Sequence, residues 1–575
     1  MQWQDAYKRW KNFSGLDETL QTQLENIEDE TDLEDRFYKH LEFGTGGMRG
    51  IIGPGTNRMN IYTVRKAAEG LARYIEEQGE AAKQRGVVIA YDSRHQSKTF
   101  ALESAKTIGQ HGIQTYVFES LRTTPELSFA VRYLHACSGI VITASHNPAP
   151  YNGFKVYGED GAQFASEDAE VIVDKVNSVE NELEISVAGQ QALLDEGLLT
   201  MIGEKVDKAY LEKVASLSLQ PEMIHDMANE LRIVYTPLHG TGNRPVQEGL
   251  AKIGLKQVEV VKEQEQPDPD FSTVKQPNPE EDAAFELAIQ YGEKNQADIL
   301  LATDPDTDRV GVAVRNKTGT YELLNGNQIG ALLVHYLINE KEKRNELADN
   351  AVVLKTIVTS ELGSEIARAH GLTSIDTLTG FKYISEKIKE FETTGAYEFL
   401  IGYEESYGYL IGDFVRDKDA VQTCLLIAEA AAHHKKNGMS LKDVLDRLYD
   451  TYGFYQEGLE SLTLEGRAGV ETIAAIMDDF RTNPPTRLAE KDVLVSEDYA
   501  SSKRKFIWED REETIELPTS NVLKYKLNDG AWFCIRPSGT EPKIKFYFGV
   551  KEATKEGSSH TLHNLKQAVM AKVKA

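Results

Sequence analysis

The 575-residue chain repeats one arrangement many times. A short β-branched apolar run ends in a loop of Gly, Asp, Ser, Thr or Asn, and a helical segment follows. Continuous apolar strands that alternate with helices indicate largely parallel sheets covered on both faces. In such sheets, ligands bind beyond the carboxyl ends of the strands. We therefore expect several α/β units in tandem and a site built from the loops that follow the runs at 86–94, 138–147, 231–243, 297–309, 350–360 and 397–406.

Both ends of the chain depart from this pattern. Residues 1–40 carry apolar residues at helical spacing in an acidic background, which predicts an amphipathic helix. The stretch 531–550, "AWFCIRPSGTEPKIKFYFGV", resembles a hairpin, and a helix over 561–574 is expected after it. The C-terminal part is therefore expected to be α+β. At ~100–200 residues per domain, the length suggests three to five domains.

Composition excludes some classes of binding partner but does not identify one. Lys and Arg number 64 against 91 Asp and Glu, a formal charge of −27, which argues against a general nucleic-acid or membrane-surface binder. Anionic ligands are still possible, because a local cluster of Arg and Lys reverses the field within a cleft. Cys137, Cys424 and Cys534 lack metal-ligand spacing and lie in apolar runs, which predicts buried free thiols in a reducing compartment. No apolar run reaches the ~18–20 residues of a membrane span, so we expect a cytoplasmic protein.

The loop "TDPDTDR" places Asp304, Asp306 and Asp308 directly after an apolar run. Three carboxylates this close repel one another unless a divalent cation such as Mg²⁺ neutralises them. An EF-hand is excluded, because Arg309 and Arg315 stand where Gly and Glu are required. Two alternatives remain open: a polar turn with helix-capping aspartates, and a phosphatase whose first Asp is phosphorylated.

The loop "IRPSGTEPK" gathers the groups that bind a phosphate dianion. Arg536, Ser538, Gly539, Thr540 and Lys543 supply a guanidinium fork, two hydroxyls, backbone N–H groups and an ammonium. Charge-assisted bonds together with a nest of N–H donors are what a phosphate requires. An ordinary turn is the alternative.

Three further loops carry weaker signals. In "GYEESYGY", Glu404 and Ser406 are two residues apart, so on an extended chain they face the same way and suit neighbouring sugar hydroxyls. "GTGGMRG" resembles a phosphate loop and contributes Arg49, but it lacks the Lys-Ser/Thr ending of a Walker motif. "TGFKY" and "VRDKDAV" each contain one lysine, and for either lysine alone an exposed surface position is the expectation.

Ser145, in "TASHNP", has three possible roles: a hydrolase nucleophile, a phosphoryl carrier, or a serine at a strand end that caps the next turn, which is the expectation for this motif taken alone. A hydrolase nucleophile would sit in G-x-S-x-G, and the glycines of that elbow are missing here. With a metal loop and a phosphate loop elsewhere in the chain, phosphoryl transfer is the better fit, with Ser145 accepting and returning the phosphoryl group. Pro148 prevents a helix from continuing through the loop and biases Asn147 toward extended geometry, which we expect to keep Ser145 exposed.

Taken together and in this order, the loops "GTGGMRG", "TASHNP", "DPDTDR", "TGFK", "GYEESYG" and "RPSGTEPK" resemble the α-D-phosphohexomutase family, in its phosphoglucomutase branch. The resemblance covers nearly the whole chain. It implies three tandem similar α/β domains with mixed, largely parallel sheets and a C-terminal α+β domain, arranged around a central cleft. The domains implied in this chain are 1–205, 206–318, 319–450 and 451–575.

The same resemblance implies roles for individual residues. Ser145 would be the phosphoserine and, through a phosphoryl oxygen, a ligand of Mg²⁺ beside Asp304, Asp306 and Asp308. Residues implied in substrate binding are Arg49, Arg309, Thr379, Glu404, Ser406, Lys418, Arg536, Ser538, Gly539 and Thr540. Arg49, Lys155 and His146 are the candidates for assisting proton transfer.

The activity implied is the interconversion of glucose 1-phosphate and glucose 6-phosphate through a glucose 1,6-bisphosphate intermediate. Phosphopentomutase or bisphosphate synthase activity is the same-family alternative, because "FGTGGMRG" and the N-terminal helix resemble a subgroup that contains such enzymes. From other classes, an Asp-nucleophile phosphatase and a catalytically silent sugar-phosphate sensor are the alternatives. We expect a small-molecule sugar phosphate as partner, no nucleic acid or membrane, and a monomer or weak dimer.

Overall fold

The structure is a computed structural model that describes residues 3–44, 46–164, 166–464, 466–538 and 543–574. Its chain divides into two compact units. One consists of Met1–Ile329 and Ile384–Leu441, and the other of Gly330–Tyr383 and Lys442–Ala575. Each unit is described by itself.

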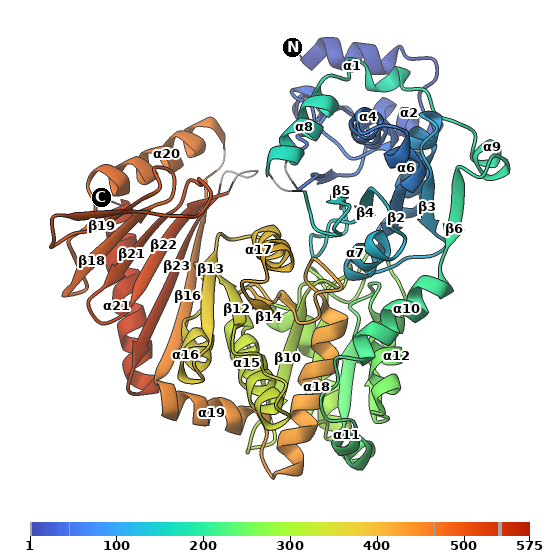
Figure 1. The fold of residues 1–575 in the computed structure, drawn as a ribbon. Helices are drawn as coiled ribbons and strands as arrows, with labels where there is room; N and C mark the ends of the chain where they lie inside the picture. Colours follow the sequence, from blue (N-terminus) through green and yellow to red (C-terminus); the bar gives the residue numbers. More distant parts are fainter. Residues whose placement is uncertain (1–2, 45, 165, 465, 539–542, 575) are drawn as a thin grey trace. The chain divides into compact units, whose positions relative to one another are not determined.

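A six-stranded mixed sheet begins the first unit (Figure 1). Its strands are β1 (Met48–Ile51), β2 (Val87–Tyr91), β3 (Thr115–Phe118), β4 (Ser138–Ile142), β5 (Tyr151–Gly158) and β6 (Leu199–Ile202), in the order β1-β5-β4-β2-β3-β6. The central strand β2 is parallel to β3 and β4, whereas β5 is antiparallel to β4 and β1. β2 and β4 are buried along their whole length, as expected for apolar strands covered on both faces.

The helices of this sheet are α4 (Ile61–Glu77), α6 (Ser97–Gln110), α7 (Thr124–Tyr133) and α8 (Ser166–Asn177). α7 packs closely on β4 because Gly139 has no side chain, and a Cβ there would lie 2.6 Å from Val131 of the helix. This close packing brings the first turn of α7 to the end of β4, where the Ser145 loop begins.

A second mixed sheet in the same unit carries the aspartate loop. Its strands are β7 (Ile233–Thr236), β8 (Val258–Val260), β9 (Ile299–Thr303), β10 (Val310–Arg315) and β11 (Tyr321–Leu324), in the order β11-β10-β9-β7-β8. β7 is parallel to β8 and β9, and β9 turns back into the antiparallel β10. The aspartate loop is therefore the tip of a buried hairpin.

The rest of the first unit supplies a short antiparallel pair and a central helix. β14 (Glu398–Tyr403) pairs with β15 (Tyr409–Leu410), and the loop between them holds the predicted sugar-binding residues. α18 (Ala420–Lys436) follows and is buried on nearly all sides, and the side chain of Asp419 caps its first turn by accepting from the N–H groups of Val421 and Gln422. A helix that is apolar all round must lie in a core.

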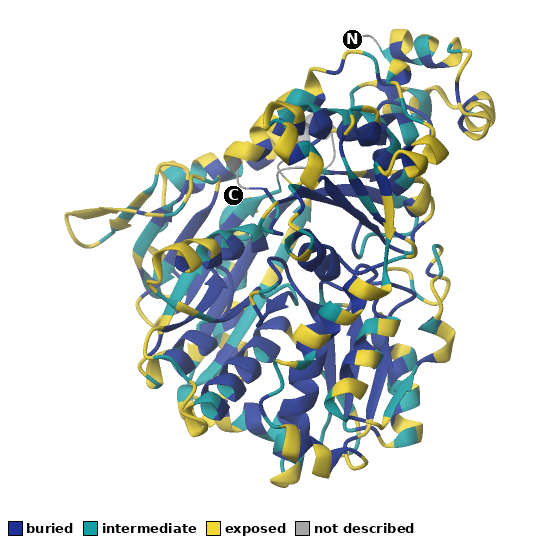
Figure 2. Cartoon of the chain, turned by 45° about the vertical axis from the view of Figure 1, so that its right-hand side comes forward, coloured by how far each residue is buried: buried dark blue, intermediate teal, exposed yellow. Residues whose placement is uncertain are grey.

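The second unit contains a parallel pair and a large antiparallel sheet. β12 (Ala351–Thr356) is parallel to β13 (Thr373–Thr377). The antiparallel strands are β16 (Phe454–Thr463), β18 (Lys491–Asp498), β19 (Lys503–Phe506), β20 (Arg511–Thr514), β21 (Leu523–Leu527), β22 (Trp532–Pro537) and β23 (Lys543–Glu552), in the order β16-β23-β22-β21-β18-β19-β20. Figure 2 shows the middle of this sheet buried and the β19–β20 hairpin exposed. The expected hairpin and C-terminal helix are present as β22, β23 and α21 (Lys555–Lys574).

The expected fold class is confirmed: three tandem α/β domains with mixed sheets are followed by an antiparallel sheet domain. The single N-terminal helix expected over residues 1–40 is wrong. The chain forms α1 (Trp3–Lys11), α2 (Glu18–Glu25) and α3 (Glu30–Phe37), because the side chains of Asp17 and Asp29 accept from backbone N–H groups and start new helices.

Of the cysteines, Cys424 and Cys534 are buried as expected, but Cys137 is only half-buried. Among the described residues, no helix has both the length and the apolar character needed to cross a membrane.

Candidate active site

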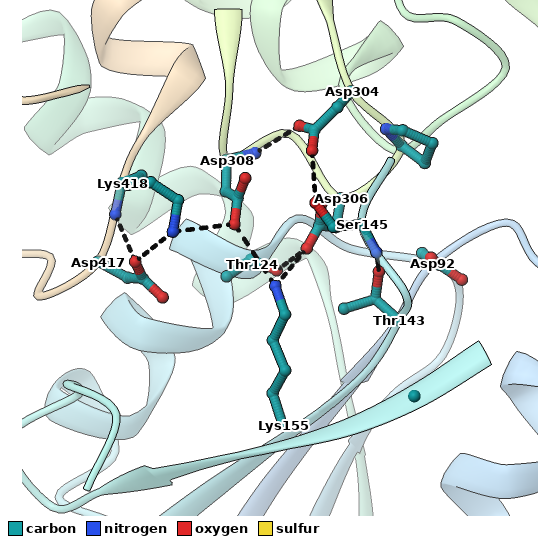
Figure 3. Close-up of polar contacts among 12 residues, drawn as sticks. Asp92, Thr124, Thr143, Ser145, Lys155, Asp304, Asp306, Asp308, Asp417 and Lys418 are labelled. Atoms are coloured by element: carbon teal, nitrogen blue, oxygen red, sulfur yellow. Dashed lines mark hydrogen bonds and ion pairs between the residues drawn. The ribbon is translucent and has the colours of Figure 1, made fainter. Parts of the chain in front are cut away.

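Ser145 lies in the loop that leaves β4, with its side chain turned toward the aspartate loop (Figure 3). Its Oγ donates to Asp304 Oδ2 at 2.8 Å, and His146 Nδ1 lies 3.1 Å from Ser145 Oγ. The backbone has a φ of +51°, an uncommon conformation for a residue with a side chain. The expectation that Ser145 is exposed is wrong: it is 3% exposed, because the hairpin tip from the second sheet covers it.

The aspartate loop holds three buried carboxylates close together. One ligand atom from each of Asp304, Asp306 and Asp308 lies within 4.8 Å of the others. Asp304 Oδ1 accepts from the N–H groups of Asp308 and Arg309, each at 3.0 Å, which fixes the turn. Burial and the two neighbouring carboxylates raise the pKa of Asp304 well above its ordinary value.

These residues fit a divalent cation. Within the described part of the chain, Asp306 Oδ1 and Asp308 Oδ1 are buried and have no hydrogen-bond partner. Buried carboxylate oxygens without partners are costly unless a cation binds them. Three oxygen ligands from one short loop suit Mg²⁺, which takes its remaining ligands from water or phosphate.

Two buried lysines lie beside the carboxylates (Figure 3). Lys155, from β5, lies with its Nζ 2.8 Å from Asp306 Oδ2 and 3.4 Å from Asp308 Oδ2. The Nζ of Lys418 lies 3.2 Å from Asp308 Oδ2 and 2.9 Å from Asp417 Oδ1. Burial opposes the charge of both lysines, but the nearby carboxylates outweigh it and raise the pKa of each. The exposed position expected for the lysine of "VRDKDAV" taken alone is therefore wrong.

The segment around Lys418 is held by residues from distant parts of the first unit. The N–H of Arg416 donates to Ser128 Oγ at 2.8 Å, and Tyr157 Oη donates to Asp417 Oδ2 at 2.9 Å. Asp417 also accepts from Lys418, so it links β5 to this lysine. These bonds join the segment 416–418, which follows the predicted sugar-binding loop, to α7 and to the six-stranded sheet that leads to Ser145.

The loop between β14 and β15 pairs with the exit of the aspartate loop. Glu404 is buried, and its N–H donates to Gly408 O at 2.9 Å. Gly408 forms a β-bridge with Arg309, and a Cβ at Gly408 would lie 2.2 Å from Lys418 Cδ, so the lysine stem passes directly over the loop. Ser406 is half-buried in the same loop. Glu404 and Ser406 are thus placed beside Arg309 and Lys418.

Two further predicted residues lie at this cluster. Arg49, on β1, is exposed and donates from Nη1 to Asn147 Oδ1 at 2.9 Å. Burial is the largest cause of the lowered pKa of His146, and the charges of Arg309 and Arg49 add to it. The candidates for proton transfer therefore surround the Ser145 loop.

The remaining predicted residues belong to the second unit. Thr379 follows β13, Arg536 lies near the end of β22, and the N–H of Ser538 donates to Lys543 O at 2.7 Å. Gly539 and Thr540 lie outside the described residues. The substrate-binding roles of these residues stay predictions.

Two residues at the site were not predicted from the sequence. Thr124, in the first turn of α7, donates from its N–H to Asp306 O and from its Oγ1 to Asp306 Oδ2, both at 2.9 Å. Glu280 forms an ion pair with Arg309 through Oε1 and Nη1. "TTPEL" indicates only a helix start, and "PNPEE" carries no signal for a partner of Arg309, so neither role could be read from the chain.

Comparison with known proteins agrees with this architecture. Four models of the phosphoglucomutase/phosphomannomutase family match: α/β/α domain I at residues 40–183, domain II at 208–319, domain III at 325–452 and the C-terminal domain at 462–558. A phosphoglucomutase of Staphylococcus haemolyticus is 39% identical over 95% of this chain and 97% of its own length. One from Staphylococcus aureus is 39% identical over 91% of this chain and 92% of its own length.

Solved structures share the fold at low identity. A phosphoglucomutase/phosphomannomutase family protein of Burkholderia thailandensis superposes with a TM-score of 0.65 at 18% identity, covering 92% of this chain and 97% of that one. The open form of the phosphoglucomutase pp63/parafusin from Paramecium gives 0.67 at 14% identity, covering 93% and 95%. The chain belongs to the phosphoglucomutase/phosphomannomutase family of α-D-phosphohexomutases.

Proposed function

We propose that this protein is a phosphoglucomutase, which interconverts glucose 1-phosphate and glucose 6-phosphate with Ser145 as the phosphoryl carrier. The observation that carries the proposal is the 2.8 Å hydrogen bond from Ser145 Oγ to Asp304, because it joins a candidate nucleophile to a carboxylate triplet that fits Mg²⁺. The staphylococcal relatives named phosphoglucomutase, at 39% identity, support the same reaction.

The residues around Ser145 have complementary tasks. Asp304, Asp306 and Asp308 would hold Mg²⁺, which when bound neutralises the charge that develops on the transferring phosphoryl group. Lys155 and Lys418 keep positive charge beside the same carboxylates. Arg309, which pairs with Glu280 in this structure, would turn to the phosphoryl oxygens when they are present. Such positioning and charge stabilisation make up most of phosphoryl-transfer catalysis.

The reaction takes place in two halves. First, the 6-hydroxyl oxygen of glucose 1-phosphate attacks the phosphorus on Ser145, so that a P–O bond to the sugar forms and the P–Oγ bond breaks. The hydroxyl proton passes by way of His146, which its lowered pKa keeps neutral, to the departing Oγ. Arg49 and Lys155 stay protonated and assist this transfer through their positive charge. The glucose 1,6-bisphosphate formed then turns end for end. Ser145 Oγ attacks its 1-phosphate, the bond to O1 breaks, and O1 takes a proton to leave glucose 6-phosphate and phosphoserine.

The sugar and its second phosphate need their own contacts. Glu404 and Ser406 would bind sugar hydroxyls, and Thr379 would contribute to the choice of sugar. Arg536, Ser538, Gly539 and Thr540 would hold whichever phosphate is not reacting. Because each phosphate must use both sites in turn, we infer that the C-terminal domain moves to let the intermediate turn. The formal charge of −27 argues against nucleic-acid partners, and we expect a cytoplasmic enzyme that is a monomer or weak dimer.

The main alternative from another class is a phosphatase with Asp304 as the nucleophile. Asp304 Oδ1 accepts from two backbone N–H groups, and Oδ2 lies 2.8 Å from Ser145 Oγ. A phosphoryl group on Oδ2 would displace Ser145 and take a position needed for the cation, whereas a phosphoryl group on Ser145 leaves the three carboxylates to bind the cation. This arrangement favours Ser145 as the group that is phosphorylated. A silent sugar-phosphate sensor would bind without turnover, which the assay below detects.

A comparison of three substrates tests the proposal. With fixed Mg²⁺ and catalytic glucose 1,6-bisphosphate, we expect turnover of glucose 1-phosphate to exceed that of mannose 1-phosphate and ribose 1-phosphate. Faster turnover of ribose 1-phosphate would instead assign a phosphopentomutase, and formation of bisphosphate without isomerisation would assign a synthase. Release of inorganic phosphate as the main product would reject the mutase.

Replacing Glu404 by glutamine should weaken sugar binding more than it slows chemistry. Hydrogen bonds to a charged group are worth about 1.5–3 kcal/mol, so the KM for glucose 1-phosphate is expected to rise about 10-fold to 100-fold. The coupled assay over a range of substrate concentrations measures this change. Glu398→Gln is the matched control. Glu398 lies at the exposed start of β14, the strand that leads to Glu404, and its replacement should leave KM unchanged. An unchanged KM for Glu404→Gln would remove Glu404 from the sugar-binding set.

A further inference from the structure

Arg94 is a buried arginine, 3% exposed, in the loop that follows β2. Its guanidinium donates to four backbone carbonyls of the loop that carries Ser145. Nη2 reaches Ser145 O and Asn147 O, each at 2.5 Å, and Nη1 reaches Pro148 O at 2.9 Å and Tyr151 O at 3.1 Å. One side chain thus holds both ends of the seven-residue stretch from Ser145 to Tyr151.

The guanidinium itself is held from the opposite side. Its Nε lies 3.2 Å from Asp92 Oδ2, and Asp92 Oδ1 accepts from the N–H of Arg94 and from Ser97 Oγ. Arg94 Cζ lies over the ring of Phe271, 4.9 Å from the ring centroid. Phe271 comes from the part of the chain that forms the second sheet. A planar fork that stacks on an aromatic ring and bonds several carbonyls is a role that lysine cannot fill.

This arrangement acts on a strained backbone. Ser145 has a φ of +51°, and a residue with a side chain pays about 1–3 kcal/mol for a sparsely populated conformation. Such a conformation persists only where its surroundings determine it. Arg94 binds the carbonyl of Ser145 itself and that of Asn147, on either side of His146. Without these bonds, the backbone at Ser145 would relax, and its Oγ would no longer be directed at Asp304.

We propose that Arg94 is a positioning residue for phosphoryl transfer, whose guanidinium holds the Ser145 loop in the geometry that aims Oγ at the aspartate loop. The proposal rests on the proposed role of Ser145 as phosphoryl carrier. Arg94 contacts the backbone of the loop and makes no bond to the transferring group. Its loss therefore affects the rate of transfer, whereas the groups that bind the sugar stay in place.

The test uses Arg94→Ala and Arg94→Lys in the full chain. For both variants, we expect kcat with glucose 1-phosphate to fall at least 100-fold and KM to change less than 3-fold, as for removal of an interaction needed in the transition state. Transfer of labelled phosphate from glucose 1,6-bisphosphate to Ser145 should slow by the same factor. Added guanidinium ions should raise the kcat of Arg94→Ala at least 10-fold. Asp92, Phe271 and the four carbonyls still surround the space that the side chain leaves. Sodium chloride at equal ionic strength is the control and should restore nothing.

Arg65→Lys is the matched control. Arg65 also bonds a carboxylate, Glu103 at 2.7 Å, and stacks on an aromatic ring, Tyr62 at 5.3 Å, but it does not touch the Ser145 loop. Its kcat should stay within 2-fold of that of the unmodified protein. If Arg94→Ala does not fold, Phe271→Leu, which removes the ring that keeps the guanidinium in place over the loop, should still lower kcat 3-fold to 10-fold with KM unchanged.

Three results would overturn the proposal: kcat within 3-fold of the unmodified protein in the Arg94 variants, a loss expressed mainly in KM, or a folded Arg94→Ala whose activity guanidinium does not restore. Failure of the proposed function is seen separately, because the unmodified protein would then not take labelled phosphate on Ser145. Labelling of Ser145 in the unmodified protein tests the proposed function, and the kcat of the Arg94 variants tests the role of Arg94.

Discussion

Ser145→Ala is expected to lower mutase activity by about 10,000-fold or more, the scale found when a nucleophile is removed from an enzyme. The variant keeps the backbone and removes only the oxygen that accepts the phosphoryl group. Oγ bonds Asp304 at 2.8 Å, whereas the hydroxyl of Thr143, two residues earlier, accepts from the N–H of Ser145, so we do not expect it to replace Oγ. The coupled assay measures the loss, and intact mass with peptide mapping shows whether phosphate from glucose 1,6-bisphosphate still reaches the peptide that contains residue 145.

The matched control for this variant is Ser138→Ala. Ser138 is a buried serine on β4, the strand that leads to Ser145, and its Oγ donates to Tyr157 O at 2.7 Å. Its loss should cost about 1 kcal/mol of stability and leave kcat within 2-fold. Full mutase activity in Ser145→Ala would refute the phosphoserine mechanism. Phosphate found on Asp304 in place of Ser145 would assign the phosphatase alternative.

Asp304→Asn is expected to lower activity by roughly 1,000-fold, since metal-bound charge stabilisation is worth several kcal/mol. Asparagine can still accept from the N–H groups of Asp308 and Arg309, so the turn is kept. The variant removes one of three mutually repelling buried carboxylates. Without added metal, it should therefore melt at the same temperature as the unmodified protein or higher. The rise in melting temperature that Mg²⁺ produces should shrink or disappear, because stabilisation by a ligand follows its affinity.

Asp298→Asn serves as the control for the metal experiment. Asp298 immediately precedes the same strand, β9, and pairs with Lys435 at 2.7 Å on the side away from the aspartate loop. It should lower the melting temperature slightly and leave the effect of Mg²⁺ intact. An equal Mg²⁺-induced rise in Asp304→Asn and in the unmodified protein would show that Asp304 is not a ligand.

Much of the site could be predicted because its residues follow apolar strands. Ser145 follows β4, Asp304 follows β9 and Glu404 follows β14, each within three residues of the end of a strand. The end of such a run is visible in the chain, and in α/β sheets ligands bind beyond the carboxyl ends of the strands. The aspartate triplet carried a further signal, because alternating carboxylates repel one another without a cation.

Residues that act from the middle of an element were harder to predict. Lys155 lies within β5, and only the antiparallel register that pairs it with Val141 of β4 aims it at the aspartate loop. Lys418 alone suggested an exposed lysine, but Asp308 and Asp417 hold it in the interior. The roles of Thr124, Glu280 and Arg94 depend on partners 182, 29 and 51 residues or more away in the chain. Local pattern contains no information about such partners.

The sequence by itself determined the tandem α/β organisation, the hairpin near the C-terminus, and the loops that carry Ser145, the aspartates and Glu404. These features depend on the periodicity of apolar residues and on short motifs, which are local. Only the tertiary structure decided that Ser145 is buried against Asp304, that two lysines accompany the carboxylates, and that one arginine holds the serine loop by four carbonyls. Those facts depend on which distant segments pack together, and packing is set by the whole chain.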